Sequence, residues 1–308
     1  MPRRLGLVLR LAGTCLGLAW IALAVDLRAA QGALARIPVA TAALAFALIA
    51  VNVAAGALRW KTVLRAYGAT RIPSNGRLTY LYFVSFFYNN FLPGAVAGDV
   101  GRGVVTHDAF DGEGTTGAMA VVLVERALGL CGLFVLLAVG LALAGGAIDT
   151  GSLWFWTVLG TVGSCALVAA IPVARHLARW LPRPLAKIAS RLPALHDRRA
   201  FAVAIVLSVA TQLAVALAGW VILASLGPIT FRGSLLVVPL AAATAFLPIT
   251  VGGAGAREAV YVALCGRLFG MAQADALAAS LGLWFAHLGV GLVGGAAQLV
   301  TRKSRVTA

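Results

Sequence analysis

The stretch FLPGAVAGDVGR, residues 91–102, places a proline, three glycines, an aspartate and an arginine within a mostly apolar chain. Proline lacks a backbone N–H and breaks a helix, whereas glycine permits tight backbone turns. The stretch therefore predicts a helix that stops and restarts here. The purpose of such a break depends on the surroundings, which are strongly hydrophobic.

The composition is that of a membrane protein, with 61% hydrophobic and 11% charged residues in 308. Runs of roughly 20 apolar residues are long enough to cross a bilayer. Two further apolar stretches, 78–92 and 233–250, are shorter and end at or contain a proline. We expect an all-α polytopic fold with about six full spans and two re-entrant or broken helix hairpins. The six runs lie at about 5–25, 37–58, 117–145, 151–172, 201–226 and 274–300.

The net charge of +15 has an ordinary explanation in a membrane chain, because basic residues are retained on the cytoplasmic side. Six crossings place both termini and the basic segments 59–77 and 173–200 on that side. We therefore expect cytoplasmic termini and no nucleic-acid partner. The first run is kept as a span because it is long for a signal peptide and no convincing cleavage site follows it. Arginine far outnumbers lysine, which suggests a GC-rich bacterial genome and hence a bacterial cytoplasmic membrane.

The polar segment 173–200 follows Pro172 and contains three further prolines and regularly spaced basic residues. This spacing suits a short amphipathic helix lying on anionic lipid. The segment also divides the chain into two halves.

The sequence as a whole contains no CxxC pair, histidine cluster or hydrolase motif. We therefore expect no metal, cofactor or catalytic residue.

A second stretch, FLPITVGGAGAR at residues 246–257, matches FLPGAVAGDVGR at six of twelve positions with an offset of 155. The shared order of the flanking apolar stretches favours a duplication. The half-repeats would cover about 37–145 and 201–300, joined through 151–172 and 173–200, within one transmembrane domain. They are inverted if the short stretches are re-entrant and parallel if each crosses fully; the charge distribution favours the re-entrant form.

Broken helices are tolerated in a bilayer only within protein or beside a wet cavity. When paired in inverted halves they form the substrate sites of secondary transporters, and their N-termini favour anions. The candidate substrate-binding residues follow from this placement. They are Asn89, Asn90, Pro93, Gly98, Asp99, Arg102, Glu125 and Arg126 in the first half, and Pro248, Gly252, Gly253, Gly255, Arg257 and Glu258 in the second.

Glu125 and Arg126 are adjacent on a predicted span and point about 100° apart, so each requires its own partner. Asp99 and Arg102 are the candidates. These four could instead form a structural ion-pair network. Arg257 could be an anchor at the outer interface, and the two asparagines could only cap broken backbone. The polar residues Asn52, Gln212 and His287 are interpreted as interhelical hydrogen-bonding groups.

The combined motifs NNFLPGAVAGDVGRG, VERALG and FLPITVGGAGAREA resemble the flippase-like family named for the transmembrane region of lysylphosphatidylglycerol synthase. The resemblance covers nearly the whole chain. It implies a domain that translocates or handles membrane lipids. Synthase activity is not expected, because only eight residues follow the last span. The family usually has Gly-Gly-Asp where this chain has Ala97, Gly98 and Asp99.

The leading hypothesis is a flippase-type transporter for an anionic or polar-headed lipid, such as a phospholipid or a polyprenyl-phosphate-linked lipid. Arg102, Arg126 and Arg257 would contact the headgroup, whereas Asp99, Glu125 and Glu258 would orient these arginines or couple protons. An alternative is an accessory subunit that presents lipid-linked substrate to a glycosyltransferase or another lipid-biosynthesis partner. A lipid-modifying enzyme is a third reading.

Overall fold

The computed structural model describes residues 3–92, 96–111, 114–144, 151–180, 182–246, 250 and 252–306. Within these residues all regular secondary structure is helical, so the predicted all-α class is confirmed. The first half contains α1 (Arg3–Ala24), α2 (Leu27–Ala35), α3 (Val39–Ala66), α4 (Asn75–Phe91), α5 (Ala97–Val105), a 3-10 turn (His107–Ala109) and α6 (Gly114–Ala144). The second contains α7 (Leu153–His176), a 3-10 turn (Ala178–Trp180), α8 (Arg183–Ala189), α9 (Arg198–Leu226), α10 (Phe231–Ala243), a 3-10 turn (Thr244–Phe246), α11 (Ala256–Phe269) and α12 (Gln273–Val306).

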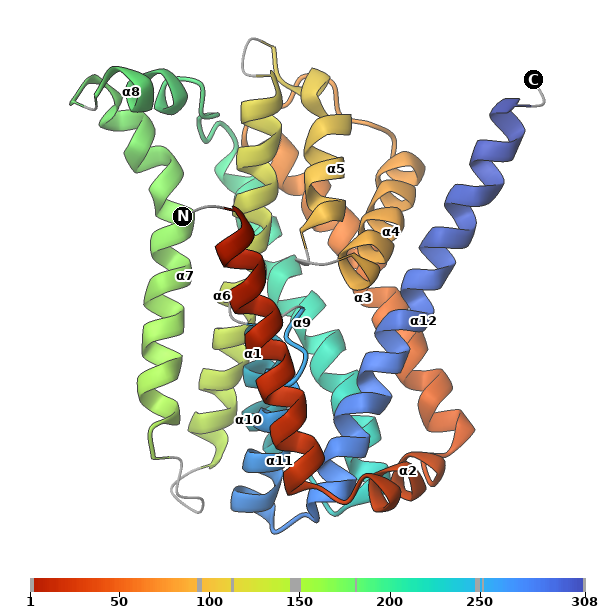
Figure 1. The fold of residues 1–308 in the computed structure, drawn as a ribbon. Helices are drawn as coiled ribbons and strands as arrows, with labels where there is room; N and C mark the ends of the chain where they lie inside the picture. The colour runs from red at the N-terminus through yellow and green to blue at the C-terminus, as the bar shows by residue number, and fades with distance from the viewer. Residues whose placement is uncertain are drawn as a thin grey trace.

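Five helices, α3, α6, α7, α9 and α12, are long and apolar enough to cross a membrane. The α1–α2 pair, bent by 88°, makes a sixth if it is counted as one span. The long helices run between the two ends of the molecule, and α3 and α9 pack along one another (Figure 1). The chain is therefore a multi-pass membrane protein.

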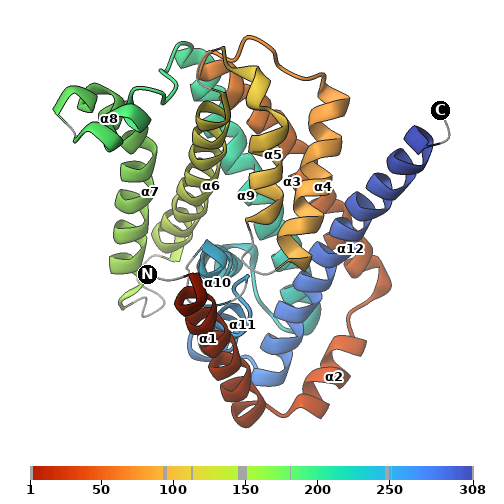
Figure 2. The same ribbon diagram turned by 45° about the horizontal axis from the view of Figure 1, so that its top comes forward.

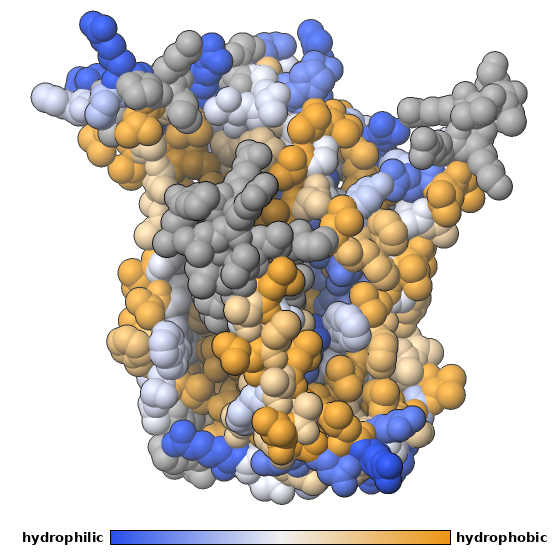
Figure 3. Space-filling view, in the orientation of Figure 1, coloured by the Kyte–Doolittle hydropathy of each residue, from blue (hydrophilic) through white to orange (hydrophobic). Residues whose placement is uncertain are grey.

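The outer surface shows where the bilayer lies. Large apolar side chains are exposed along the helices, and among them Leu23, Val39 and Leu16 are 90%, 86% and 72% exposed. Figure 3 shows this apolar surface as a belt, with hydrophilic residues gathered at both ends of the molecule. Lipid tails are the solvent that favours such a surface.

The two short helices α4 and α5 occupy the end of the molecule where α8 and the C-terminus lie (Figure 1). They pack against each other, and the residues that flank the pair meet again. The Thr70 N–H donates to the Ala109 carbonyl at 2.9 Å, and Arg71 pairs with Asp111 at 3.9 Å. The chain thus enters and leaves this helix pair at the same end.

The helices α10 and α11 form a similar pair at the other end, near α2 (Figure 1). The start of α10 meets the end of α11, because a Cβ added at Gly233 would lie 2.9 Å from the Phe269 ring. Figure 2 shows the pair surrounded by the longer helices, and α10 packs on α6 and α9 whereas α11 packs on α12 and α1.

Local sequence accounts for the helix boundaries. The Asp26 and Asp197 carboxylates accept backbone N–H groups at the starts of α2 and α9, and Ser74 does so for α4. Gly270 ends α11 with a φ of 63°, a conformation that favours glycine. The basic segment 173–200 holds the end of α7 and the short α8, which lies across the end of α7 in Figure 1.

Candidate functional site

Glu125 is the centre of a buried ionic network. It lies eleven residues into α6, about 16 Å along the helix axis, and is 1% exposed. Its carboxylate accepts hydrogen bonds from Arg59 Nε at 3.0 Å, the Tyr82 hydroxyl at 2.8 Å and Arg102 Nη2 at 2.9 Å. Two arginines and a tyrosine from α3, α4 and α5 therefore converge on one acidic group of α6. Such convergence compensates part of the cost of burying charge.

Asp99, in the first turn of α5, joins the same network. Its carboxylate pairs with Arg126 and accepts from Arg102 Nη2 at 2.5 Å. Asn89 donates to this carboxylate at 3.2 Å and accepts the Gly98 N–H at 2.9 Å, which ties the end of α4 to the start of α5. Glu125 and Arg126 thus find separate partners in Arg102 and Asp99, in agreement with their adjacent positions on a helix.

The guanidinium of Arg102 also lies over two aromatic rings. Its Cζ is 4.4 Å from the centroid of Tyr82 and 4.9 Å from that of Trp60. Cation–π contacts of this kind are strongest where water is excluded. They help to hold Arg102, which binds both carboxylates.

The second helix pair supplies its own ion pair. Gly255 begins α11 with a φ of 83°, and its N–H donates to Glu258 at 2.7 Å. The same carboxylate accepts Arg257 Nε at 2.8 Å and the Ser280 hydroxyl at 3.3 Å. Arg257 lies 5.7 Å from the centroid of the Trp284 ring of α12. Glu258 therefore both caps the helix and orients the arginine.

The two halves face a common central cavity of about 490 Å³. Four arginines line it, three from the first half and one from the second, together with two carboxylates. Arg126 lies 5.9 Å from the ring centroid of Phe246, in the 3-10 turn that follows α10, so the halves also touch there. The charged lining residues are Arg59, Asp99, Arg102, Glu125, Arg126 and Arg257.

Figure 3 shows hydrophilic residues in a hollow of the apolar surface between α1 and the helices α4 and α12. Thr14 of α1 lines the cavity on this side. A Cβ added at Gly17 would lie 2.9 Å from Gly255, so α1 packs directly on the start of α11. A polar chamber that is open sideways toward lipid suits an amphiphilic ligand.

The structure brings most of the predicted residues together. Asn89, Asn90, Asp99, Arg102, Glu125, Arg126, Gly252 and Arg257 line the cavity. Four predicted residues do not line the cavity, namely Gly98, Gly253, Gly255 and Glu258. Gly98 packs on the backbone of Ser85, and Gly253 packs on that of Ala245. Pro93 and Pro248 lie outside the described residues. Asn90 donates to the Phe86 carbonyl of its own helix at 2.8 Å, whereas Asn89 bridges two helices.

Two sequence interpretations require correction. Arg59 was assigned to a cytoplasmic loop, but α3 continues to Ala66 and buries Arg59 at 6% exposure against Glu125. The signal lay in the absence of glycine and proline between residues 58 and 66, which predicts a continuing helix. The reading of Arg257 as an outer anchor also fails, because its side chain is 18% exposed and lines the cavity.

The lone polar residues of the long helices also line the cavity. Asn52 and Gln212 make no hydrogen bond to any described residue, and His287 bonds the Leu283 carbonyl of its own helix. The prediction of interhelical hydrogen bonds was therefore wrong for them. Within the described part of the chain, no three histidine, cysteine or acidic side chains are placed to hold a metal ion.

Comparison with models of known protein families gave a match for this chain. The model described as "Lysylphosphatidylglycerol synthase TM region" matches residues 7–295, which is most of the chain. Comparison with curated proteins gave no match. This family of membrane domains is associated with lipid handling. By this match, and in agreement with its helical membrane fold, the chain belongs to the lysylphosphatidylglycerol synthase transmembrane-region family.

Proposed function

We propose that the protein is a flippase-type transporter that moves an anionic or polar-headed lipid across the bacterial cytoplasmic membrane. The observation that carries the proposal is the central cavity, where arginines of both helix pairs face one space inside the apolar belt. Ionisable groups at such a depth are costly, and transporters use them to bind substrate. A volume of about 490 Å³ is in the range of sites for small ligands.

The proposal includes an inverted repeat, with half-repeats at about 37–145 and 201–300. The two helix pairs each begin and end at one end of the molecule, and the two ends are opposite (Figure 1). This arrangement supports two re-entrant hairpins that enter the membrane from opposite faces. We infer that both termini are cytoplasmic, because that orientation retains the basic segments inside.

The charges of the site favour a phosphate-bearing headgroup. Four arginines stand against Asp99, Glu125 and Glu258, which leaves one positive charge in excess. Guanidinium groups bind phosphate oxygens through paired hydrogen bonds. The headgroup would bind between Arg126 and Arg257, while the acyl chains remain in lipid through the opening beside α1. The three carboxylates hold the arginines in position, and no covalent step is required of them.

Reconstitution in liposomes tests this function. Purified protein with fluorescent phosphatidylglycerol should accelerate exposure of the lipid to a membrane-impermeant quencher. Arg257→Gln should lower the rate about 10- to 100-fold, because a hydrogen bond to a charged group contributes about 1.5–3 kcal/mol. Arg232→Gln is the matched control, since Arg232 is exposed on α10.

The liposome experiment also distinguishes a transporter from an accessory subunit. If neither a phospholipid nor a polyprenyl-phosphate lipid is moved faster than in protein-free vesicles, transport is refuted. Stable co-purification with a glycosyltransferase in that case would favour the accessory role.

A further inference from the structure

A second cavity lies beside the central one, between α4, α5 and α12. This groove has a volume of about 630 Å³. We propose that the groove is a separate binding site for the phosphate headgroup of an anionic lipid. Arg77 stands at one end of its α4 wall and Tyr88 near the other, about 16 Å apart along the helix. The site would hold lipid outside the central cavity. Its role in transport, but not the binding itself, rests on the proposed function.

The first reason is the state of Arg102, which is 4% exposed and lines the groove. A single nitrogen, Nη2, donates to both Asp99 and Glu125. Its Nε and Nη1 are buried and have no hydrogen-bond partner. The aromatic contacts involve the faces of rings and do not satisfy these N–H donors. Unsatisfied buried donors of a charged group are rare, and they indicate a missing acceptor.

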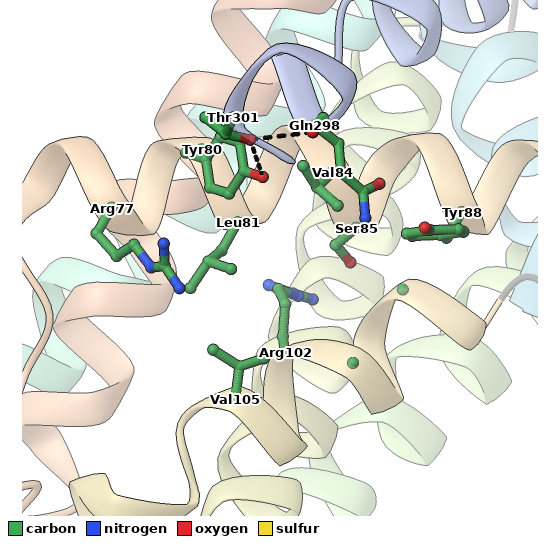
Figure 4. Close-up of a pocket in the computed structure, with 12 residues that line it drawn as sticks. Arg77, Tyr80, Leu81, Val84, Ser85, Tyr88, Arg102, Val105, Gln298 and Thr301 are labelled. Atoms are coloured by element: carbon green, nitrogen blue, oxygen red, sulfur yellow. Dashed lines mark hydrogen bonds between the residues drawn. The ribbon is translucent and has the colours of Figure 1, made fainter. Parts of the chain in front are cut away.

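Figure 4 shows where this side chain points. Arg102 extends from α5 toward α4, and its guanidinium lies close to Leu81 and Ser85 inside the groove. Arg77 extends into the same space from near the start of α4. A hydrogen bond of 2.8 Å between Tyr80 and Thr301 joins α4 to α12 at this end. The groove is therefore a pocket whose walls come from the three helices α4, α5 and α12.

The second reason is charge. The groove is lined by two arginines and by no carboxylate among the described residues. Arg77 makes no ion pair with a described residue, whereas Arg102 pairs with Asp99 and Glu125, which do not line the groove. An anion in the groove would thus face the guanidinium groups of Arg77 and Arg102 without a carboxylate in the lining. Phosphate matches them, because its oxygens accept several N–H donors at once.

The third reason is the apolar surroundings, which favour a lipid over free phosphate. Leu81, Val84 and Val105 line the groove between the two arginines. Val105 and its neighbour Val104 are 49% and 52% exposed on the outer side of α5. A headgroup between the arginines would therefore have its acyl chains beside exposed valines, within the apolar belt. Inorganic phosphate would gain nothing from this wall.

Arg102 and Ser85 line both cavities. The arginine thus forms the wall between the groove and the central cavity. A headgroup bound in the groove would lie beside the same guanidinium that holds Asp99 and Glu125. The groove is therefore placed to deliver lipid to the central cavity or to receive it.

Glycine provides a way to fill the groove without disturbing the fold. Gly101 lines it, and a Cβ added there would meet no atom within 4 Å. Gly101→Leu should therefore occupy the ligand's space while α5 stays helical. Gly76→Leu is the matched control, because a Cβ at Gly76 also meets nothing and Gly76 does not line the groove.

The test is photo-crosslinking of the purified full chain with phosphatidylglycerol that carries a diazirine in its acyl chain, mapped by mass spectrometry. Wild-type protein should be labelled on α4, α5 and the end of α12. Gly101→Leu should reduce this labelling at least 10-fold and leave labelling near Leu283 and Trp284 of the central cavity unchanged. Arg77→Gln should reduce it several-fold, whereas Arg65→Gln, exposed on α3, should not.

Unlabelled phosphatidylglycerol should compete for the groove, and phosphatidylcholine or inorganic phosphate should compete far less. Labelling of α4 and α5 that persists in a folded Gly101→Leu protein overturns the inference, as does equal competition by inorganic phosphate. Because crosslinking requires no translocation, groove labelling in a protein without flippase activity would refute the proposed function and leave the site standing.

Discussion

At the scale of single residues, the network is held by few atoms. Glu125 carries the opposing charge for both Arg59 and Arg102, and its three partners leave it 1% exposed. Arg59 also donates to Thr211 of α9 at 3.1 Å, so a first-half arginine is fixed by a second-half helix. Removing one partner of a buried pair leaves an uncompensated charge, which costs more than the pair contributes.

Glu125→Gln should therefore destabilise the protein strongly. We expect a loss of about 3–5 kcal/mol, because buried Arg59 loses its counter-charge and buried Arg102 keeps only Asp99. Thermal unfolding in detergent micelles measures the effect. Asp111→Asn is the control, since its pair with Arg71 is exposed and such pairs contribute only about 0–1 kcal/mol. Equal melting temperatures for the two variants would contradict the role given to Glu125.

At the scale of elements, α4 is held by close backbone approaches on two sides. A methyl group at Gly98 of α5 would overlap the Ser85 carbonyl, and one at Gly294 of α12 would overlap the Phe83 carbonyl. Glycine at these positions lets three helices approach closely, which is the usual way that helices pack in membranes. The positions of Arg102 and Asp99 depend on this contact, because α5 is only nine residues long.

Gly98→Ala and Gly101→Ala form a matched pair on α5. Gly98→Ala should cost about 1–3 kcal/mol, as overpacked interiors do, and should separate α5 from α4. Gly101→Ala should be neutral or stabilise by up to about 1 kcal/mol, since its Cβ enters open space and alanine favours helix. Thermal unfolding of both variants decides this; a Gly98→Ala protein as stable as Gly101→Ala would show that the contact is not tight.

The elements also show what the sequence predicts and what it does not. Apolar length predicted the long spans, and the prolines predicted the short helices α4 and α10. Charge counting misplaced Arg59, because a basic residue near a span end was read as a loop residue although nothing there breaks the helix. The groove depends on which nitrogen of Arg102 meets the carboxylates and on an open face at Gly101, and neither follows from residue order.

At the scale of the whole molecule, the proposed inverted repeat depends on which face of the membrane each helix pair enters from. Thr70 and Ala109 meet at one end of the molecule, and Gly233 and Phe269 meet at the other. If both pairs are re-entrant, residues on either side of each pair share one side of the membrane. If a pair instead crossed fully, its two flanks would lie on opposite sides.

Cysteine labelling in membrane vesicles tests this topology. The native cysteines Cys15, Cys131, Cys165 and Cys265 are first replaced by serine or alanine. Arg71→Cys and Asp111→Cys, each introduced singly, should then react with an impermeant maleimide from the cytoplasmic face only. Arg232→Cys and Arg267→Cys should react only from the opposite face, since α9 separates them from the basic segment. Asp111→Cys reacting from the face opposite to Arg71→Cys would mean that α4 and α5 cross the membrane together, and the inverted arrangement would then be wrong.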